Sequence, residues 1–150
     1  MKIWTNRFIG VIAVGGGWYA IVLILAMFRD PEFSVGDKFF FIVFSALYIW
    51  GILCGIYMIS NHKNGIRYSK YFYAIQIPAL MTKVVGYSFF SGMYLSVTYS
   101  LNFQSITAKF SLGSIFQYNL FASRSEYYFG LNIIPIIILI YLFMLSRSAK

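Results

Sequence analysis

The side chains of this chain that could bind a metal ion or react are few, and their densest group is acidic. Asp30, Glu32 and Asp37 lie within eight residues of one another. Carboxylates at such distances can bind a hard cation such as Ca²⁺, which takes about six to eight oxygen ligands. Their spacing does not match a calcium-binding loop. We therefore predict a solvated acidic connector, and we expect neither a metal ion nor another cofactor.

The remaining candidates for chemistry are isolated. His62 is the only histidine and Cys54 the only cysteine, whereas a zinc site needs several such ligands and a nucleophile needs a base within reach. Cys54 lies inside a hydrophobic run, where we expect it to pack. The sequence contains no phosphate-binding glycine loop, dinucleotide fingerprint or nucleophile elbow. We expect a noncatalytic protein and no enzyme.

A short basic segment has two interpretations. Residues 61–70 include His62, Lys63, Arg67 and Lys70. At a membrane surface such residues attract anionic lipid headgroups, by about 1 kcal/mol for each Lys or Arg. The excess of Lys and Arg in cytoplasmic loops explains the segment equally well, and we adopt that explanation. It predicts a cytoplasmic N-terminus and an acidic connector on the outer side.

Composition indicates a membrane protein. The chain of 150 residues is 60% hydrophobic and only 11% charged, against about 25% charged in an ordinary soluble domain. The net charge of +8 reflects the presence of only four acids. Nucleic-acid binding would require a dense basic face on a recognisable module, and the sequence has neither. The first predicted partner is therefore a lipid bilayer.

Two uncharged apolar runs, 8–28 and 39–60, are each long enough to cross a bilayer as a helix. The short connector between them predicts a helical hairpin. Small residues at spacings of four allow close approach of helix backbones. The predicted helix-contact residues are Ala13, Gly17, Gly51 and Gly55.

A β-rich segment is predicted at about 73–122. Apolar and polar residues alternate strictly over residues 95–104, which is the period of a half-buried strand. Residues 108–120 alternate less strictly and predict a second, antiparallel strand, and one or two short strands are expected before residue 90. The alternative is a transmembrane helix over 84–101, giving a bundle of four transmembrane helices. The polar face of the main strand is a candidate surface, formed by Ser96, Thr98, Ser100, Asn102 and Gln104.

A third spanning helix is predicted over 127–145, where Asn132 and Pro135 are candidates for an interhelical hydrogen bond and a kink. Three crossings put the basic C-terminus outside, in conflict with the charge rule, and four would bring it back inside. We expect one integral membrane domain over 1–150: a helical hairpin, a small cytoplasmic β-sheet and a C-terminal transmembrane helix.

The predicted function is that of a membrane-anchored subunit or adaptor that associates with itself or a protein partner through the β segment. A sheet of about 50 residues buries too little apolar area to be stable alone, which favours association. The alternatives are a small oligomeric channel lined by the polar face and an immunity protein against a membrane-acting toxin. The preferred location is a bacterial inner membrane, crossed more than once.

Overall fold

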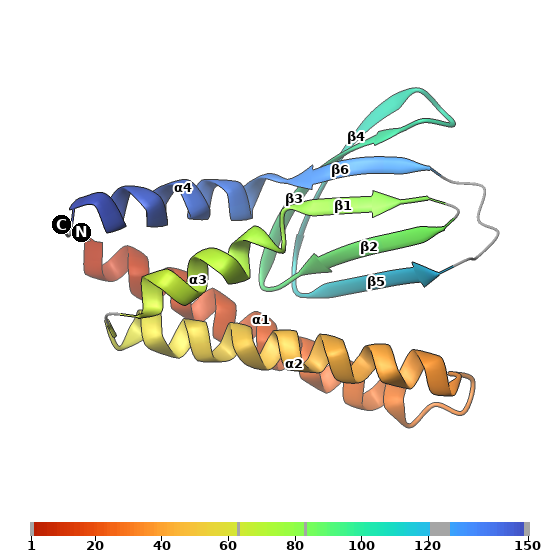
Figure 1. Cartoon of the computed structure of the whole chain (residues 1–150), viewed down its shortest axis with the longest axis horizontal. Coiled ribbons are helices and arrows are strands. Elements are labelled where there is room, and N and C mark those ends of the chain that lie inside the picture. The colour runs from red at the N-terminus through yellow and green to blue at the C-terminus, as the bar shows by residue number, and fades with distance from the viewer. Residues whose placement is uncertain (1, 63, 83, 121–126, 149–150) are drawn as a thin grey trace.

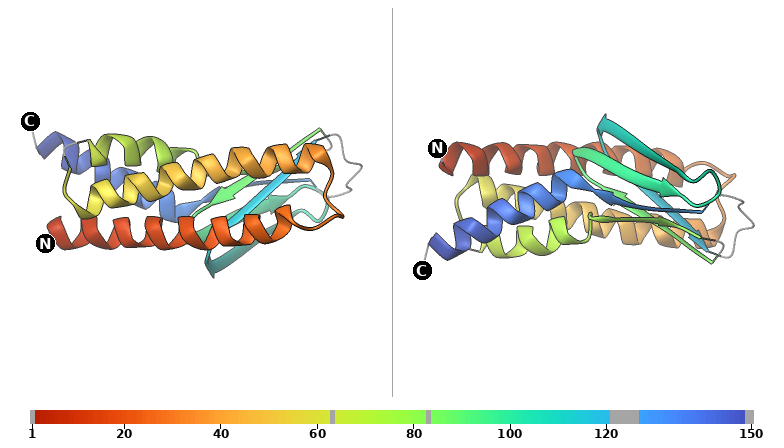
Figure 2. Two further views of the ribbon diagram at one scale, coloured as in Figure 1. Left: turned by 90° about the horizontal axis from the view of Figure 1, so that it is seen from below. Right: turned by 90° about the horizontal axis from the view of Figure 1, so that it is seen from above.

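The computed structural model describes residues 2–62, 64–82, 84–120 and 127–148, which form two layers (Figure 1). One layer is a long helical hairpin of α1 (Lys2–Phe28) and α2 (Val35–Ile59). In the other layer, the shorter helices α3 (Gly65–Ala74) and α4 (Ile133–Ser148) lie end to end with a six-stranded antiparallel sheet. Figure 2 shows that α1 and α2 lie side by side and that the strands run obliquely to them.

The predicted helical hairpin is confirmed. The ranges Ile3–Phe28 and Val35–Ile59 are long and apolar enough to cross a membrane. Helix α2 begins four residues earlier than predicted, because Ser34 and Asp37 form a capping box. The Asp37 amide donates to Ser34 Oγ at 3.2 Å, and the Ser34 amide donates to Asp37 Oδ2 at 2.9 Å. These bonds satisfy backbone donors that a helix start leaves unpaired.

Glycines let the two long helices touch. A Cβ added to Gly10 would lie 2.6 Å from the Gly55 carbonyl oxygen, and one added to Gly55 would lie 2.6 Å from the Gly10 oxygen. A Cβ on Gly17 would lie 2.5 Å from Ile52 Cγ1. Close approach of this kind is available only to residues without a side chain.

The strands are β1 (Pro78–Met81), β2 (Val85–Phe90), β3 (Met93–Ser100), β4 (Ser105–Leu112), β5 (Ile115–Leu120) and β6 (Tyr128–Asn132). Their order across the sheet is β4-β3-β6-β1-β2-β5, and every pairing is antiparallel. The prediction of strands in this part of the chain is confirmed. The alternative bundle of four transmembrane helices is wrong, because residues 85–90 and 93–100 pair as strands.

The start of the predicted third spanning helix is also wrong. Residues 128–132 form β6, the strand between β1 and β3, and only then does the chain become helical. The sixteen residues of α4 would rise about 24 Å, less than the roughly 30 Å of a bilayer core. Pro135 lies in the first turn of α4, where a missing amide proton costs no helical hydrogen bond. Asn132 ends β6, and its Oδ1 accepts from the Leu95 amide at 3.0 Å.

Aromatic side chains fill the core between the layers. Phe41, Phe44 and Tyr48 of α2 are buried against Phe89 of β2 and Phe116 of β5. The Tyr48 hydroxyl donates to the Phe90 carbonyl at 3.1 Å. Since aromatic rings bury the most apolar area per residue, this contact is the main one between α2 and the sheet.

Gly16 joins helix α1 to two turns of the sheet. Ser114, in the turn between β4 and β5, donates its Oγ proton to the Gly16 carbonyl at 2.7 Å. The same Oγ accepts from the Gly92 amide at 3.2 Å, in the turn between β2 and β3. A Cβ on Gly16 would overlap the Gly92 backbone, and Gly92 itself has φ +88°. Three segments distant in sequence therefore meet at the middle of α1.

The ends of the hairpin differ. The start of α1, the end of α2, the start of α3 and the end of α4 lie at one end (Figure 1), and Arg7, Arg67 and Arg147 belong to these parts of α1, α3 and α4. The sheet lies along the other half, next to the acidic connector. The sheet and the segment 61–70 therefore lie toward opposite ends of the hairpin, whereas the sequence predicts both on the cytoplasmic side; the side of the membrane stays a prediction. Strand β6 and helix α4 return the chain to the end of the hairpin at which α1 begins.

Candidate functional site

The sheet curls around a polar groove of about 220 Å³. Thr98 of β3 pairs with Thr107 of β4, and Ser88 of β2 pairs with Gln117 of β5. All four side chains line the groove. Tyr128 of β6 donates its hydroxyl proton to Gln117 Oε1 at 3.3 Å. Because β6 and β5 are separated by two strands, this bond shows how strongly the sheet is curved.

The predicted polar surface is divided between this groove and a turn. Ser96 and Thr98 line the groove, and Ser100 lies two residues further along β3. Asn102 and Gln104 belong to the turn 101–104, where Gln104 has φ +46°. The strand predicted over 95–104 therefore ends at Ser100 and does not present five side chains on one face. The apolar and polar residues go on alternating over residues 101–104, but these residues form a turn, in which alternate side chains do not point to opposite faces of a sheet.

Toward α3 and α4 the groove becomes aromatic. Phe90 and Tyr94 stack with their ring centroids 4.7 Å apart and form a small buried cluster with Ala79. Ile115 packs on this cluster and also lines the groove. Next to it, the Asn132 Nδ2 group is buried and has no hydrogen-bond partner among the described residues. This end of the groove is therefore lined mainly by aromatic and aliphatic side chains.

The opposite face of the sheet is apolar. In one register row, Ile106, Tyr99, Phe129, Leu80, Tyr87 and Tyr118 follow one another from β4 to β5. Helix α2 covers the β5 end of this face. Over β3, β4 and β6 the face is exposed: Ile106 is 74% exposed, Leu112 68%, Phe110 59% and Phe129 51%. We call these residues, with Val97, Tyr99 and Leu131, the outer apolar face.

Strand β4 is also an edge of the sheet. All eight of its residues, from Ser105 to Leu112, are exposed or partly exposed. It pairs with β3 on one side, and no described strand lies on its other side. Every second residue of an edge strand directs its amide and carbonyl away from the sheet, so β4 offers a template for another strand.

The acidic residues act structurally in the described part of the chain. The Tyr118 hydroxyl donates to Asp37 Oδ1 at 2.6 Å and so joins β5 to the start of α2. Burial, and then this bond to Asp37, raise the pKa of Tyr118, which keeps the hydroxyl protonated as a donor. The Asp30 carboxylate accepts from the Glu32 amide at 3.0 Å. No group of three His, Cys, Asp or Glu side chains among the described residues is arranged for a metal ion.

The predicted helix-contact residues have different neighbours. Gly55 lies against Gly10, and Gly17 against Ile52, while Ala13 is buried. Gly51 faces the Phe72 ring of α3 and not α1. Gly10 was not singled out from the sequence. Its offset of seven residues from Gly17, on the same helix face, is the signal that could have indicated it.

The predicted basic residues also separate. The His62 ring stacks on Tyr57 with centroids 4.9 Å apart, at the end of α2. Arg67 is exposed on α3, and Lys70 turns toward α4. Lys63 lies outside the described residues. The cluster is therefore not one surface, and Lys70 has surroundings of its own.

A comparison of the chain with models of known protein families, with curated protein sequences and with solved structures finds no significant match.

Proposed function

We propose that this chain is a noncatalytic integral membrane protein whose helical hairpin crosses the bilayer and whose sheet binds a second protein chain. The hairpin provides two apolar helices of sufficient length. Exposed apolar side chains extend along both helices, from Trp4 and Phe8 to Ile56. Soluble proteins rarely expose so large a continuous apolar surface, so lipid is the environment that fits it.

The observation that carries the second half of the proposal is the combination of the outer apolar face with the β4 edge, on which no described strand lies. Lipid would cover the apolar side chains but leave the edge amides and carbonyls unpaired, at a cost of several kcal/mol each. Water would satisfy the edge but expose Ile106, Phe110 and Leu112. A strand from another chain satisfies both, because it pairs with the backbone and covers the side chains.

A pore through the sheet is less well supported. The strands have four to eight residues, whereas a spanning strand needs about nine to eleven. The polar side chains Ser96 and Thr98 face the groove inside their own sheet, and Phe90 and Tyr94 narrow it. Hence the adaptor remains the proposed function.

The experiment compares two faces of one strand. A photo-crosslinking amino acid is placed at Ile106, on the outer apolar face, or at Thr107, in the groove, in the full chain in its native membrane. We expect a protein adduct at Ile106 and none at Thr107. The mass of the adduct distinguishes a second copy from a different subunit. Crosslinks to lipid alone at Ile106 would refute the docking proposal.

A matched pair of substitutions tests which face of β4 the complex requires. Ile106→Lys places a charge on the outer apolar face, and Thr107→Lys places the same charge beside Lys109 in the groove. Ile106→Lys should abolish the complex seen by crosslinking, and Thr107→Lys should preserve it. Equal loss with both variants would indicate a general effect on folding and contradict the assignment of the face.

A further inference from the structure

A second cavity, of about 540 Å³, lies between α3 and α4 at the basic end of the molecule. Its walls are mostly apolar: Ile66 and Ala74 on α3, and Leu139 and Phe143 on α4. Lys70 and Ser146 provide polar atoms on facing sides. We call this cavity the α3–α4 cleft.

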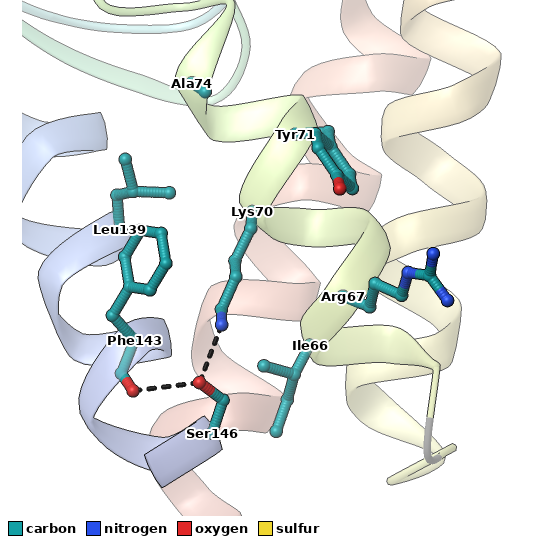
Figure 3. Close-up of a pocket in the computed structure, with 8 residues that line it drawn as sticks. All are labelled: Ile66, Arg67, Lys70, Tyr71, Ala74, Leu139, Phe143 and Ser146. Carbon is teal, nitrogen blue, oxygen red and sulfur yellow. Dashed lines mark hydrogen bonds between the residues drawn. The ribbon is translucent and has the colours of Figure 1, made fainter.

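Lys70 reaches across the cleft (Figure 3). Its Nζ donates to Ser146 Oγ at 2.7 Å and lies 4.3 Å from the centroid of the Phe143 ring. Ser146 donates its own proton to the Phe143 carbonyl at 2.9 Å, so its oxygen is free to accept from Lys70. Both partners are neutral. The ammonium is therefore partly buried without a negative charge beside it.

No carboxylate lines the cleft in the described part of the chain. The described acids are Asp30 and Glu32 of the connector and Asp37 in the first turn of α2, at the opposite end of the hairpin. A partly buried cation is stabilised by an anion, since the attraction between charges grows as water is excluded. The cleft therefore has the charge and the shape for an anionic ligand with an apolar part.

We propose that the α3–α4 cleft binds one anionic glycerophospholipid, with its phosphate at Lys70 and an acyl chain along Ala74, Leu139 and Phe143. Basic pockets between helices at the cytoplasmic face of a membrane bind phosphate headgroups in this way. The basic end of the hairpin is the end that the charge rule assigns to that face. This inference depends on the proposed membrane location, but not on the docking of the sheet.

The orientation of Arg67 supplies a control. Arg67, three residues before Lys70 on α3, also lines the cleft, but its guanidinium group points away from α4 (Figure 3). Lys70→Gln and Arg67→Gln remove the same charge from the same surface. The cleft predicts unequal effects, whereas attraction to a charged membrane surface predicts equal ones.

The test uses the purified full chain in detergent micelles with added phosphatidylglycerol or phosphatidylcholine, and counts bound lipids by native mass spectrometry. We expect one phosphatidylglycerol to be retained in preference to phosphatidylcholine. Lys70→Gln should weaken it about fivefold, the factor that corresponds to about 1 kcal/mol for one basic charge near lipid. Arg67→Gln should weaken it less than twofold.

A second variant tests the apolar part of the site. Ala74→Phe fills the cleft from an exposed position and keeps Lys70, so it should also release the lipid. Lys70→Arg, which retains the charge, should retain lipid binding. Its binding keeps the test valid if Lys70→Gln folds poorly. The proposal is overturned if phosphatidylcholine binds as well, if Lys70→Gln and Arg67→Gln have equal effects, or if Ala74→Phe has none. Complete displacement of the lipid by inorganic phosphate would instead indicate a site for a soluble anion and would also overturn it.

Discussion

Gly10→Ala tests the packing of the helical hairpin most directly. The added Cβ would lie 2.6 Å from the Gly55 carbonyl oxygen, about 0.8 Å short of an ordinary contact at 3.4 Å. The neighbour is backbone, which cannot rotate away, so α1 and α2 must separate. Overpacking of this kind costs about 1–3 kcal/mol.

Gly15→Ala is the matched control on the same helix. A Cβ on Gly15 meets nothing within 4 Å. Both substitutions gain helix propensity, worth about 1 kcal/mol for alanine over glycine. Gly15→Ala should therefore stabilise the protein by about 1 kcal/mol, and Gly10→Ala should lie about 1–3 kcal/mol below it. The difference between the two variants isolates the cost of helix separation.

The double variant Gly10→Ala with Gly55→Ala sharpens the test. Each added Cβ would lie 2.6 Å from the other glycine's oxygen, so one separation of the helices relieves both overlaps. The double variant should then cost clearly less than the sum of the two single ones, as expected for contacting residues. The assay is unfolding by sodium dodecyl sulfate in mixed micelles, followed by far-ultraviolet circular dichroism. Equal midpoints for Gly10→Ala and Gly15→Ala, or additive single effects, would refute the packing.

Two further predictions concern the arrangement of the layers. The first uses single cysteines that replace Ser34, Ser105 or His62 in a Cys54→Ser background, labelled in intact cells with a membrane-impermeant maleimide. The cysteines at positions 34 and 105 should react and the one at position 62 should not, because the turn before β4 and the acidic connector share one end of the molecule. Labelling at positions 62 and 105 together would contradict this topology. Ser114→Ala should destabilise the protein by about 1–3 kcal/mol in the same unfolding assay, because it removes the donor to the buried Gly16 carbonyl. Ser111→Ala, on the exposed strand β4, should change the stability by less than about 0.5 kcal/mol, and equal effects would argue against the junction.

Local patterns in the sequence were sufficient for the elements with a long, uniform signal. Two charge-free apolar runs predict α1 and α2, because in such runs the backbone can pair only with itself. Strict alternation predicts β3, and Ser34 followed by Asp37 could have predicted the true start of α2. Of the helix contacts, Gly17 and Gly55 were visible as small residues at regular spacing, whereas Gly10 was not singled out.

Where the sequence pattern fits more than one type of secondary structure, contacts between distant segments determine which type forms. Residues 128–132 are apolar and continuous with the residues of α4, so sequence periodicity assigns them to one helix. In the structure they lie between β1 and β3, where long-range hydrogen bonds replace local helical ones. In the same way, Gly65–Ala74 becomes helix α3 because Phe72 and Tyr73 are buried against the hairpin.

The candidate sites show the same division. The sequence determined that this chain has two long apolar helices, few acids and a basic segment, because those properties depend on composition and neighbouring residues alone. Contacts between distant residues decide which side of each strand faces the groove and that β4 lies at the edge of the described sheet. They also decide that Lys70 faces α4, where none of the described acids lies beside it. Such contacts are set by the pairing of whole elements, since shifting a strand by one residue would exchange its two faces.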